Sequence, residues 1–280
     1  MKRRRWLSWL MAGLISGLIS GLTAVGCSEL PEAASGAVST QPVAIVASAA
    51  ASLQEVLEAI APQFQAAHSE IIVDYNFGSS GALQQQIKQG APVDIFFSAA
   101  TQQMDALADR GLILPDSRQN VVSNSLVLIA PKASTLSLTR LTELKAASIT
   151  HFAVGEFRSV PAGQYAKQVL THMNLLEALQ PKLVFGNSVR SVLSAVESGN
   201  AELGLVYATD AALSDRVKVL ATVPPDAHQP IVYPIAIVQS SQHPEAAQHF
   251  INFLSTAAVQ IKFAEFGFGP AHLNSPDVSA

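Results

Sequence analysis

Four short runs of small residues in this sequence could bind an anion through backbone N–H groups. Each run follows an apolar stretch that is typical of a strand and precedes a stretch with helical spacing. The first turn of a helix leaves up to four N–H donors unpaired, and the helix dipole places a partial positive charge there, so such helix starts bind anions without lysine or arginine. The runs are Ala50-Ala51-Ser52, Gly78-Ser79-Ser80-Gly81, Pro161-Ala162-Gly163 and Asn187-Ser188-Val189.

Ordinary helix capping is the alternative for each run taken alone, because Ser and Asn are favoured N-cap residues whatever the function. The run from Gly78 to Gly81 is richer in glycine than capping requires, and glycine lets a backbone approach a ligand closely. In open α/β sheets, ligands bind outside the carboxyl ends of the strands, where all four runs are expected. Four such runs in one chain favour a shared anion site.

The elements that must position these runs alternate between strand and helix patterns. Strands are predicted over 43–47, 71–75, 94–97, 125–130, 152–155, 183–185, 203–207, 217–222 and 233–238, and helices over 53–64, 81–89, 101–110, 141–147, 162–173 and 188–198, with two more near the C-terminal end. The repeated β-α-β order predicts an α/β fold with mostly parallel sheets flanked by helices. The return to strands in the last third predicts a second lobe, entered near 121–125 and left near 231–234.

The first 27 residues have the layout of a signal peptide, with basic residues from Lys2 to Arg5 and an apolar stretch from Trp6 to Val25. A small residue directly before the lone Cys27 is typical of a lipoprotein processing site, which predicts an acylated N-terminus. Ordinary cleavage nearby, which would release a soluble protein, stays open, as does the choice between Sec and twin-arginine export. A permanent membrane helix is less favoured because glycines and serines lower helix propensity. Residues 28–42 are predicted to be a flexible tether.

The composition narrows the classes of function. The chain has 280 residues, of which 49% are hydrophobic and 14% charged, and this excludes a disordered protein. Four of the 17 basic residues and none of the 21 acidic residues lie in the leader, which leaves 13 against 21 and a formal charge of −8. An acidic protein is a poor partner for nucleic acid. The single cysteine excludes an internal disulfide, and the seven histidines lack the spacing of a zinc or catalytic site.

Longer motifs resemble the periplasmic molybdate-binding proteins of ABC transporters, in order and without large gaps from about Val43 to Phe268. The motifs are Ala49-Ala-Ala-Ser-Leu, Phe77-Gly-Ser-Ser-Gly-Ala-Leu, Gly90-Ala-Pro-Val-Asp-Ile-Phe-Phe-Ser-Ala, Asn124-Ser-Leu-Val-Leu-Ile-Ala-Pro-Lys, Val160-Pro-Ala-Gly-Gln-Tyr-Ala, Val189-Arg and Leu205-Val-Tyr-Ala-Thr-Asp. The resemblance implies a two-lobed type II periplasmic-binding-protein fold with an oxyanion in the cleft. Residues 43–122 and 233–280 would form the first lobe, and residues 123–232 the second.

The resemblance also implies which residues hold the ion. Ser52 and Ser80 would each offer a hydroxyl and a backbone N–H, Ala162 and Val189 would offer backbone N–H groups, and Tyr207 its phenolic hydroxyl. Molybdenum would be bound as molybdate through these residues, with no direct bond from protein to metal and no cofactor. The sequence departs from the family at position 81, where the best-known members have serine and this chain has glycine.

The implied function is that of a receptor rather than an enzyme. It would be a periplasmic or extracytoplasmic monomer, attached to the membrane only through a lipid anchor, that delivers molybdate to the permease of an ABC transporter. Tungstate is nearly isosteric with molybdate, so the sequence does not separate the two. Another oxyanion such as sulfate is the first alternative, and a secreted serine hydrolase is a distant one, because Gly78-Ser-Ser-Gly lacks the Gly-x-Ser-x-Gly spacing.

Three charged residues near these motifs could have other roles, in binding an anion or a metal. Arg190 follows Val189 and could clamp an anion, but an ion pair at the surface or between lobes is the favoured interpretation. Asp94 and Asp210 have no carboxylate or histidine at ligand spacing beside them, so they are predicted to have capping or interlobe roles rather than to bind a metal.

Overall fold

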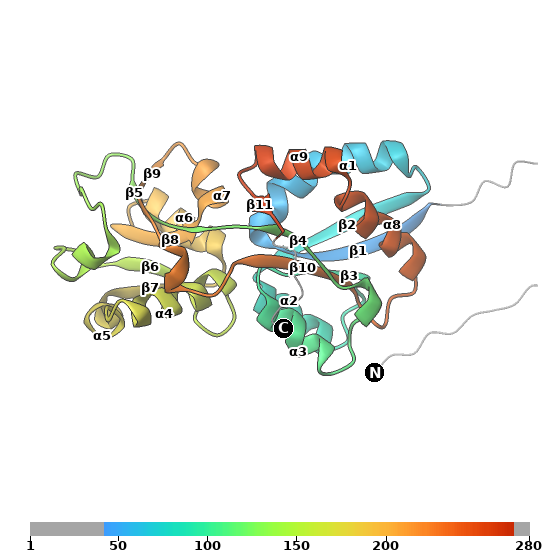
Figure 1. The fold of residues 1–280 in the computed structure, drawn as a ribbon, viewed down its shortest axis with the longest axis horizontal. Coiled ribbons are helices and arrows are strands. Elements are labelled where there is room, and N and C mark those ends of the chain that lie inside the picture. The colour runs from blue at the N-terminus through green and yellow to red at the C-terminus, as the bar shows by residue number, and fades with distance from the viewer. Residues whose placement is uncertain (1–41, 272–280) are drawn as a thin grey trace, which may run out of the picture. The chain divides into compact units, whose positions relative to one another are not determined.

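Two sheets, each flanked by helices, form the part of the protein that our computed structural model describes, which is residues 42–271 (Figure 1). The predicted signal peptide, Cys27 and nearly all of the predicted tether lie outside the described residues. Within residues 42–271, no helix combines the length and the apolar character that crossing a membrane requires.

The first sheet has the strand order β11-β4-β10-β3-β1-β2. Its strands are β1 (Val43–Ala50), β2 (Ile71–Gly78), β3 (Ile95–Phe97), β4 (Gln119–Ser123), β10 (Val232–Ile237) and β11 (Gly269–Pro270). Its helices are α1 (Gln54–Ala67), α2 (Ser80–Lys88), α3 (Thr101–Ala108), α8 (Pro244–Leu254) and α9 (Ala257–Glu265). Helices α1, α8 and α9 lie on one side of this sheet, and α2 and α3 on the other (Figure 1). Strand β1 is therefore covered on both faces, which explains its apolar sequence.

The second sheet has the strand order β7-β6-β8-β5-β9. Its strands are β5 (Leu126–Pro131), β6 (Phe152–Gly155), β7 (Leu183–Gly186), β8 (Leu203–Tyr207) and β9 (Val217–Thr222). Its helices are α4 (Pro161–His172), α5 (Leu176–Leu179), α6 (Val189–Glu197) and α7 (Ala208–Ala212). Helix α6 illustrates why these elements form. Ser188 and Ser191 make a capping box at its start, and its buried stripe packs on the sheet.

Two connections join the sheets. The chain leaves the first sheet after Ser123 and enters the second at Leu126, and it returns between Thr222 and Val232. The connections touch each other, because the N–H of Asn124 donates to the carbonyl of Ile231 at 3.1 Å.

The sheets are more mixed than the mostly parallel sheets predicted from the β-α-β order. Strand β1 is parallel to β2 and β3, and β6 is parallel to β7 and β8. Strands β10 and β5, which follow the connections between sheets, are antiparallel to both of their neighbours. A strand that arrives from the other sheet is not constrained by a helical crossover to run parallel.

Local predictions also differ from the structure, and helices α5 and α7 were not among the predicted helices. Strand β4 was not among the predicted strands, and the segment predicted as a helix over 141–147 is a 3-10 turn at Leu141–Lys145.

Candidate functional site

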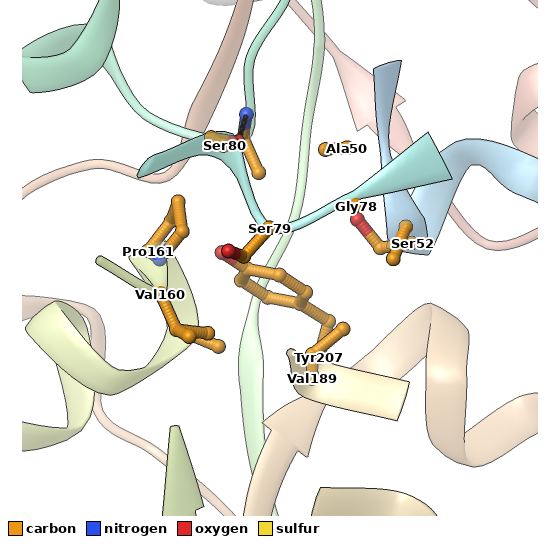
Figure 2. Close-up of a pocket in the computed structure, with 12 residues that line it drawn as sticks. Ala50, Ser52, Gly78, Ser79, Ser80, Val160, Pro161, Val189 and Tyr207 are labelled. Carbon is orange, nitrogen blue, oxygen red and sulfur yellow. Dashed lines mark hydrogen bonds between the residues drawn. The ribbon is translucent and has the colours of Figure 1, made fainter. Parts of the chain in front are cut away.

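All five residues that the resemblance implies as ligands line one cavity, which lies where strands of both sheets end and helices begin (Figure 2). The residues that line it are Ala50, Ala51, Ser52, Gly78, Ser79, Ser80, Ala99, Val160, Pro161, Ala162, Val189 and Tyr207. The space open to the centre of a water-sized sphere is about 10 Å³. Because that is about the room for a single water, the cavity in this conformation suits a ligand of a few atoms.

Ser80 is held at the start of α2. The preceding residue, Ser79, is the N-cap of this helix and accepts a hydrogen bond from the N–H of Ala82 at 3.4 Å. The Ser80 hydroxyl oxygen accepts the N–H of Ala99 at 2.9 Å, and the whole residue is buried. A backbone N–H can only donate, so the proton of the Ser80 hydroxyl is left for another acceptor.

Ser52 lies directly after the central strand β1, in a 3-10 turn over Ala51–Leu53 rather than in the α-helix itself. Its hydroxyl oxygen lies 3.0 Å from the hydroxyl oxygen of Tyr233, a fully buried residue of β10. The serine is thus tied to a strand that the chain reaches 181 residues later.

The backbone donors come from the starts of α4 and α6. Pro161 and Ala162 are the first two residues of α4, and Val189 is the first residue of α6. Pro161 has no backbone N–H, whereas the N–H groups of Ala162 and Val189 have no acceptor within their own helices. At α6 the capping box engages the N–H groups of Ser188 and Ser191 but not that of Val189, which lines the cavity.

Tyr207, the last residue of β8, is almost wholly buried at 1% exposure. Its hydroxyl has no hydrogen-bond partner among the described residues. Burial raises the pKa of this hydroxyl well above its usual value, so the group stays protonated and can donate. A buried polar atom without a partner costs free energy, so a group that accepts from this hydroxyl would stabilise the site.

None of the residues that line the cavity carries a charge. The nearest charged group in the sequence, Arg190, makes ion pairs with Glu55 of α1 and Asp210 of α7, and its Nε lies 2.9 Å from an oxygen of Asp210. Arg190 therefore links elements beside the two sheets and is not an anion clamp. Asp210 is fully buried, and this burial raises its pKa to about 7 although Arg190 opposes the shift.

Asp94 has a structural role in the first sheet. Its carboxylate accepts the N–H of Val46 at 2.8 Å and the hydroxyl of Ser241 at 2.6 Å. Among residues 42–271, no three His, Cys, Asp or Glu side chains are grouped so that they could hold a metal ion.

Sequence reasoning missed two sets of contacts around the cavity. Tyr233 hydrogen-bonds to both Ser52 and Asn124, and the N–H of Gly81 donates to the carbonyl of Ser159. These contacts join residues far apart in sequence, so no local spacing could have indicated them.

The arrangement consists of neutral donors around a small space. A tetrahedral anion presents only acceptors, so each of its oxygens could be met by an N–H or O–H group. Among the residues that line the cavity, no nucleophile lies beside a general base.

Comparisons with known proteins agree with this geometry. The model of a family described as bacterial extracellular solute-binding protein matches residues 45–269. YvgL of Bacillus subtilis, whose assigned name is that of an ABC transporter substrate-binding lipoprotein, is 40% identical over 247 residues, or 88% of this chain and 93% of its own. The molybdate-binding protein ModA of Escherichia coli is 38% identical over 226 residues, or 79% of this chain and 86% of its own.

A solved structure extends the similarity to the fold. The periplasmic molybdate-binding protein of Azotobacter vinelandii superposes with a TM-score of 0.70 at 28% identity, covering 80% of this chain and 98% of its own.

Proposed function

This chain belongs to the bacterial extracellular solute-binding proteins, and from that premise we propose that it captures molybdate or tungstate for the permease of an ABC transporter. The resemblance to molybdate-binding proteins predicted from the motifs is confirmed by relatives of that name. The predicted α/β fold, that of a type II periplasmic binding protein, is confirmed by the similarity to the Azotobacter vinelandii protein. The protein is a receptor and not an enzyme.

One observation carries the proposal. The buried hydroxyl of Tyr207, without a partner in residues 42–271, lies in a small cavity whose other polar groups are serine hydroxyls and the starts of helices. Under the proposal, Ser52, Ser80, Ala162, Val189 and Tyr207 donate to the four oxygens, and the metal atom touches no protein atom.

The donor set favours some oxyanions over others. A protonated phosphate would place its O–H against donors and leave the clash buried. Sulfate has the charge and shape of molybdate but shorter bonds, so donors fixed for the larger ion would make longer hydrogen bonds to it. The names of the relatives support molybdate over sulfate, and tungstate matches molybdate in size.

Under this proposal, two lobes close around the ion. The first lobe consists of residues 43–122 and 233–280, and the second of residues 123–232. Ser52 and Ser80 belong to the first lobe, and Ala162, Val189 and Tyr207 to the second. An ion that contacts both groups binds the closed form better and shifts the population toward it. The two connections near Asn124 and between Thr222 and Val232 would act as the hinge.

The proposal includes the cellular setting. Residues 1–27 would be removed on export, Cys27 would carry the lipid, and residues 28–42 would tether a monomeric receptor outside the cytoplasm. The lipoprotein name of the Bacillus subtilis relative supports the anchor.

Thermal unfolding tests the proposal most directly. The protein without residues 1–27 is titrated with molybdate, tungstate, sulfate and phosphate at equal concentrations. A ligand at a hundred times its Kd stabilises the fold by about 2.7 kcal/mol, which such a measurement detects. Stabilisation by molybdate and tungstate alone is expected. Stabilisation by sulfate or phosphate instead would overturn the ligand, and stabilisation by none of the four would overturn the receptor function.

A further inference from the structure

A chain of hydrogen bonds leads from the hinge to Ser52. Asn124, in the connection between β4 and β5, accepts the N–H of Ser125 through its side-chain oxygen at 2.9 Å. This contact fixes the orientation of the amide, because the oxygen must face that N–H. The amide nitrogen then faces the hydroxyl oxygens of Thr209, at 2.9 Å, and Tyr233, at 3.1 Å.

The direction of each hydrogen bond between Asn124, Tyr233 and Ser52 depends on which of their atoms carry protons. An amide nitrogen has two protons and accepts nothing, so the Tyr233 oxygen accepts from Asn124. The hydroxyl of Tyr233 has one proton, and its other contact is the Ser52 oxygen at 3.0 Å. Geometry alone allows either oxygen of this pair to donate, and donation from Tyr233 to Ser52 is favoured because the Tyr233 oxygen already accepts from Asn124. The proton of Ser52 is then free for a ligand in the cavity that Ser52 lines.

Ser80 is oriented in the same way from the other side. Its oxygen accepts the backbone N–H of Ala99 at 2.9 Å, so its proton is also free for the cavity. Both serines, each of which could donate or accept when free to rotate, are thus presented as donors.

We infer that Tyr233 and Asn124 are positioning residues that turn the Ser52 hydroxyl into a donor, and that the site thereby rejects tetrahedral anions that carry a proton. The inference rests on the proposed function, because it concerns the selectivity of the same site. Tyr233 and Asn124 do not line the cavity, so they act through Ser52. Tyr233 suits this role, since it is fully buried and burial raises its pKa far above neutrality, which keeps its proton in place.

Two anions of similar size isolate the effect of the proton. Above neutral pH, selenate and hydrogen arsenate are both tetrahedral dianions, but only hydrogen arsenate carries an O–H. The experiment measures how well each displaces radiolabelled molybdate from the full chain, from Tyr233→Phe and from Asn124→Ala. Tyr75→Phe is the matched control, because it removes a buried tyrosine hydroxyl from the same sheet at a residue that does not line the cavity.

We expect wild type and Tyr75→Phe to bind selenate at least about tenfold more tightly than hydrogen arsenate. In Tyr233→Phe the Ser52 oxygen loses its donor and becomes free to accept from the O–H of the anion. The ratio of the two affinities is therefore expected to fall by about fivefold or more, while molybdate still binds. Asn124→Ala removes the amide that donates to the Tyr233 oxygen. This variant should lower the ratio of selenate affinity to hydrogen arsenate affinity by less than Tyr233→Phe does.

The outcomes separate this inference from the proposed function. Absence of molybdate binding by the wild type would overturn the receptor function itself. Molybdate binding with equal displacement by both anions would overturn only the inference, as would an unchanged ratio in Tyr233→Phe. If neither selenate nor hydrogen arsenate displaces molybdate, the inference is also overturned, because the size of these anions alone would then explain why they do not bind.

Discussion

The backbone N–H of Gly81 donates to the carbonyl oxygen of Ser159 at 2.9 Å, which joins the start of α2 to the loop before α4. A Cβ atom on Gly81 would lie only 2.3 Å from that oxygen. The two backbones can therefore approach this closely only because position 81 lacks a side chain. The resemblance to molybdate-binding proteins implies serine at this position, and glycine here permits a direct contact between elements of the two sheets.

Gly81→Ala should weaken molybdate binding by about tenfold, because the added methyl group strains the closed arrangement that the ion stabilises. The melting temperature of the ligand-free protein should change little, because under the proposed function its lobes are free to separate. Isothermal titration calorimetry gives the affinity. Ala82→Ser, at the exposed neighbouring position of the same helical turn, is the control and should bind normally. Equal affinities for the two variants would contradict the prediction.

Ala162→Pro removes one backbone donor from the cavity while leaving the start of α4 able to form. A hydrogen bond to a charged group contributes about 1.5–3 kcal/mol, so we expect a loss of about ten- to a hundredfold in molybdate affinity. Ala162→Gly keeps the N–H and should bind within a fewfold of wild type. If both variants bind as the wild type does, Ala162 is not a ligand.

Tyr207→Phe should have opposite effects on binding and on stability. The variant loses a donor to the anion, so its affinity should fall by about tenfold or more. The ligand-free protein loses a buried hydroxyl that has no partner among the described residues, so it should be as stable as wild type or about 1 kcal/mol more stable. Urea unfolding without ligand, beside calorimetry with molybdate, measures both. A destabilised variant with full affinity would refute the assignment.

Asp210 should make stability depend on pH. Burial raises the pKa of its carboxyl to about 7 in the folded protein from a usual value of 3.8, so the folded state favours the neutral form. Its contribution is fully present below about pH 4 and is lost as the pH rises through about 7. The melting temperature of wild type should therefore fall relative to that of Asp210→Asn between about pH 5 and pH 8.

The exposed residue Asp74 supplies the matched control for this pH series. Asp74→Asn makes the same chemical change outside the core and should keep the pH profile of the wild type. A constant difference in melting temperature between wild type and Asp210→Asn across the series would contradict the prediction.

Most elements of the fold could be predicted because their signals are local. The helical spacing from Leu53 to Phe64 corresponds to α1, and the run before Gly81 ends a strand and caps a helix in the structure. Strand β4 was missed because it begins with the polar residues Gln119 and Asn120, and only its pairing with β10 makes it a strand.

The site shows the same division between local and distant signals. Four of the five predicted ligand residues lie in the runs visible in the sequence, Tyr207 ends a predicted strand, and the structure brings all five to one cavity. Their role as ligands stays a prediction. The hydrogen bonds that orient them could not be predicted, because Ser52 and Tyr233 are 181 residues apart and meet only when the second connection returns the chain.

The uncharged lining of the cavity has a consequence for the molecule as a whole. No cationic side chain is there to be neutralised when the ion enters, so a bound dianion adds both of its charges to a protein that is already acidic. Loaded and empty molecules of equal shape would therefore differ by two negative charges. Native gel electrophoresis should separate them, with the loaded form migrating faster toward the anode.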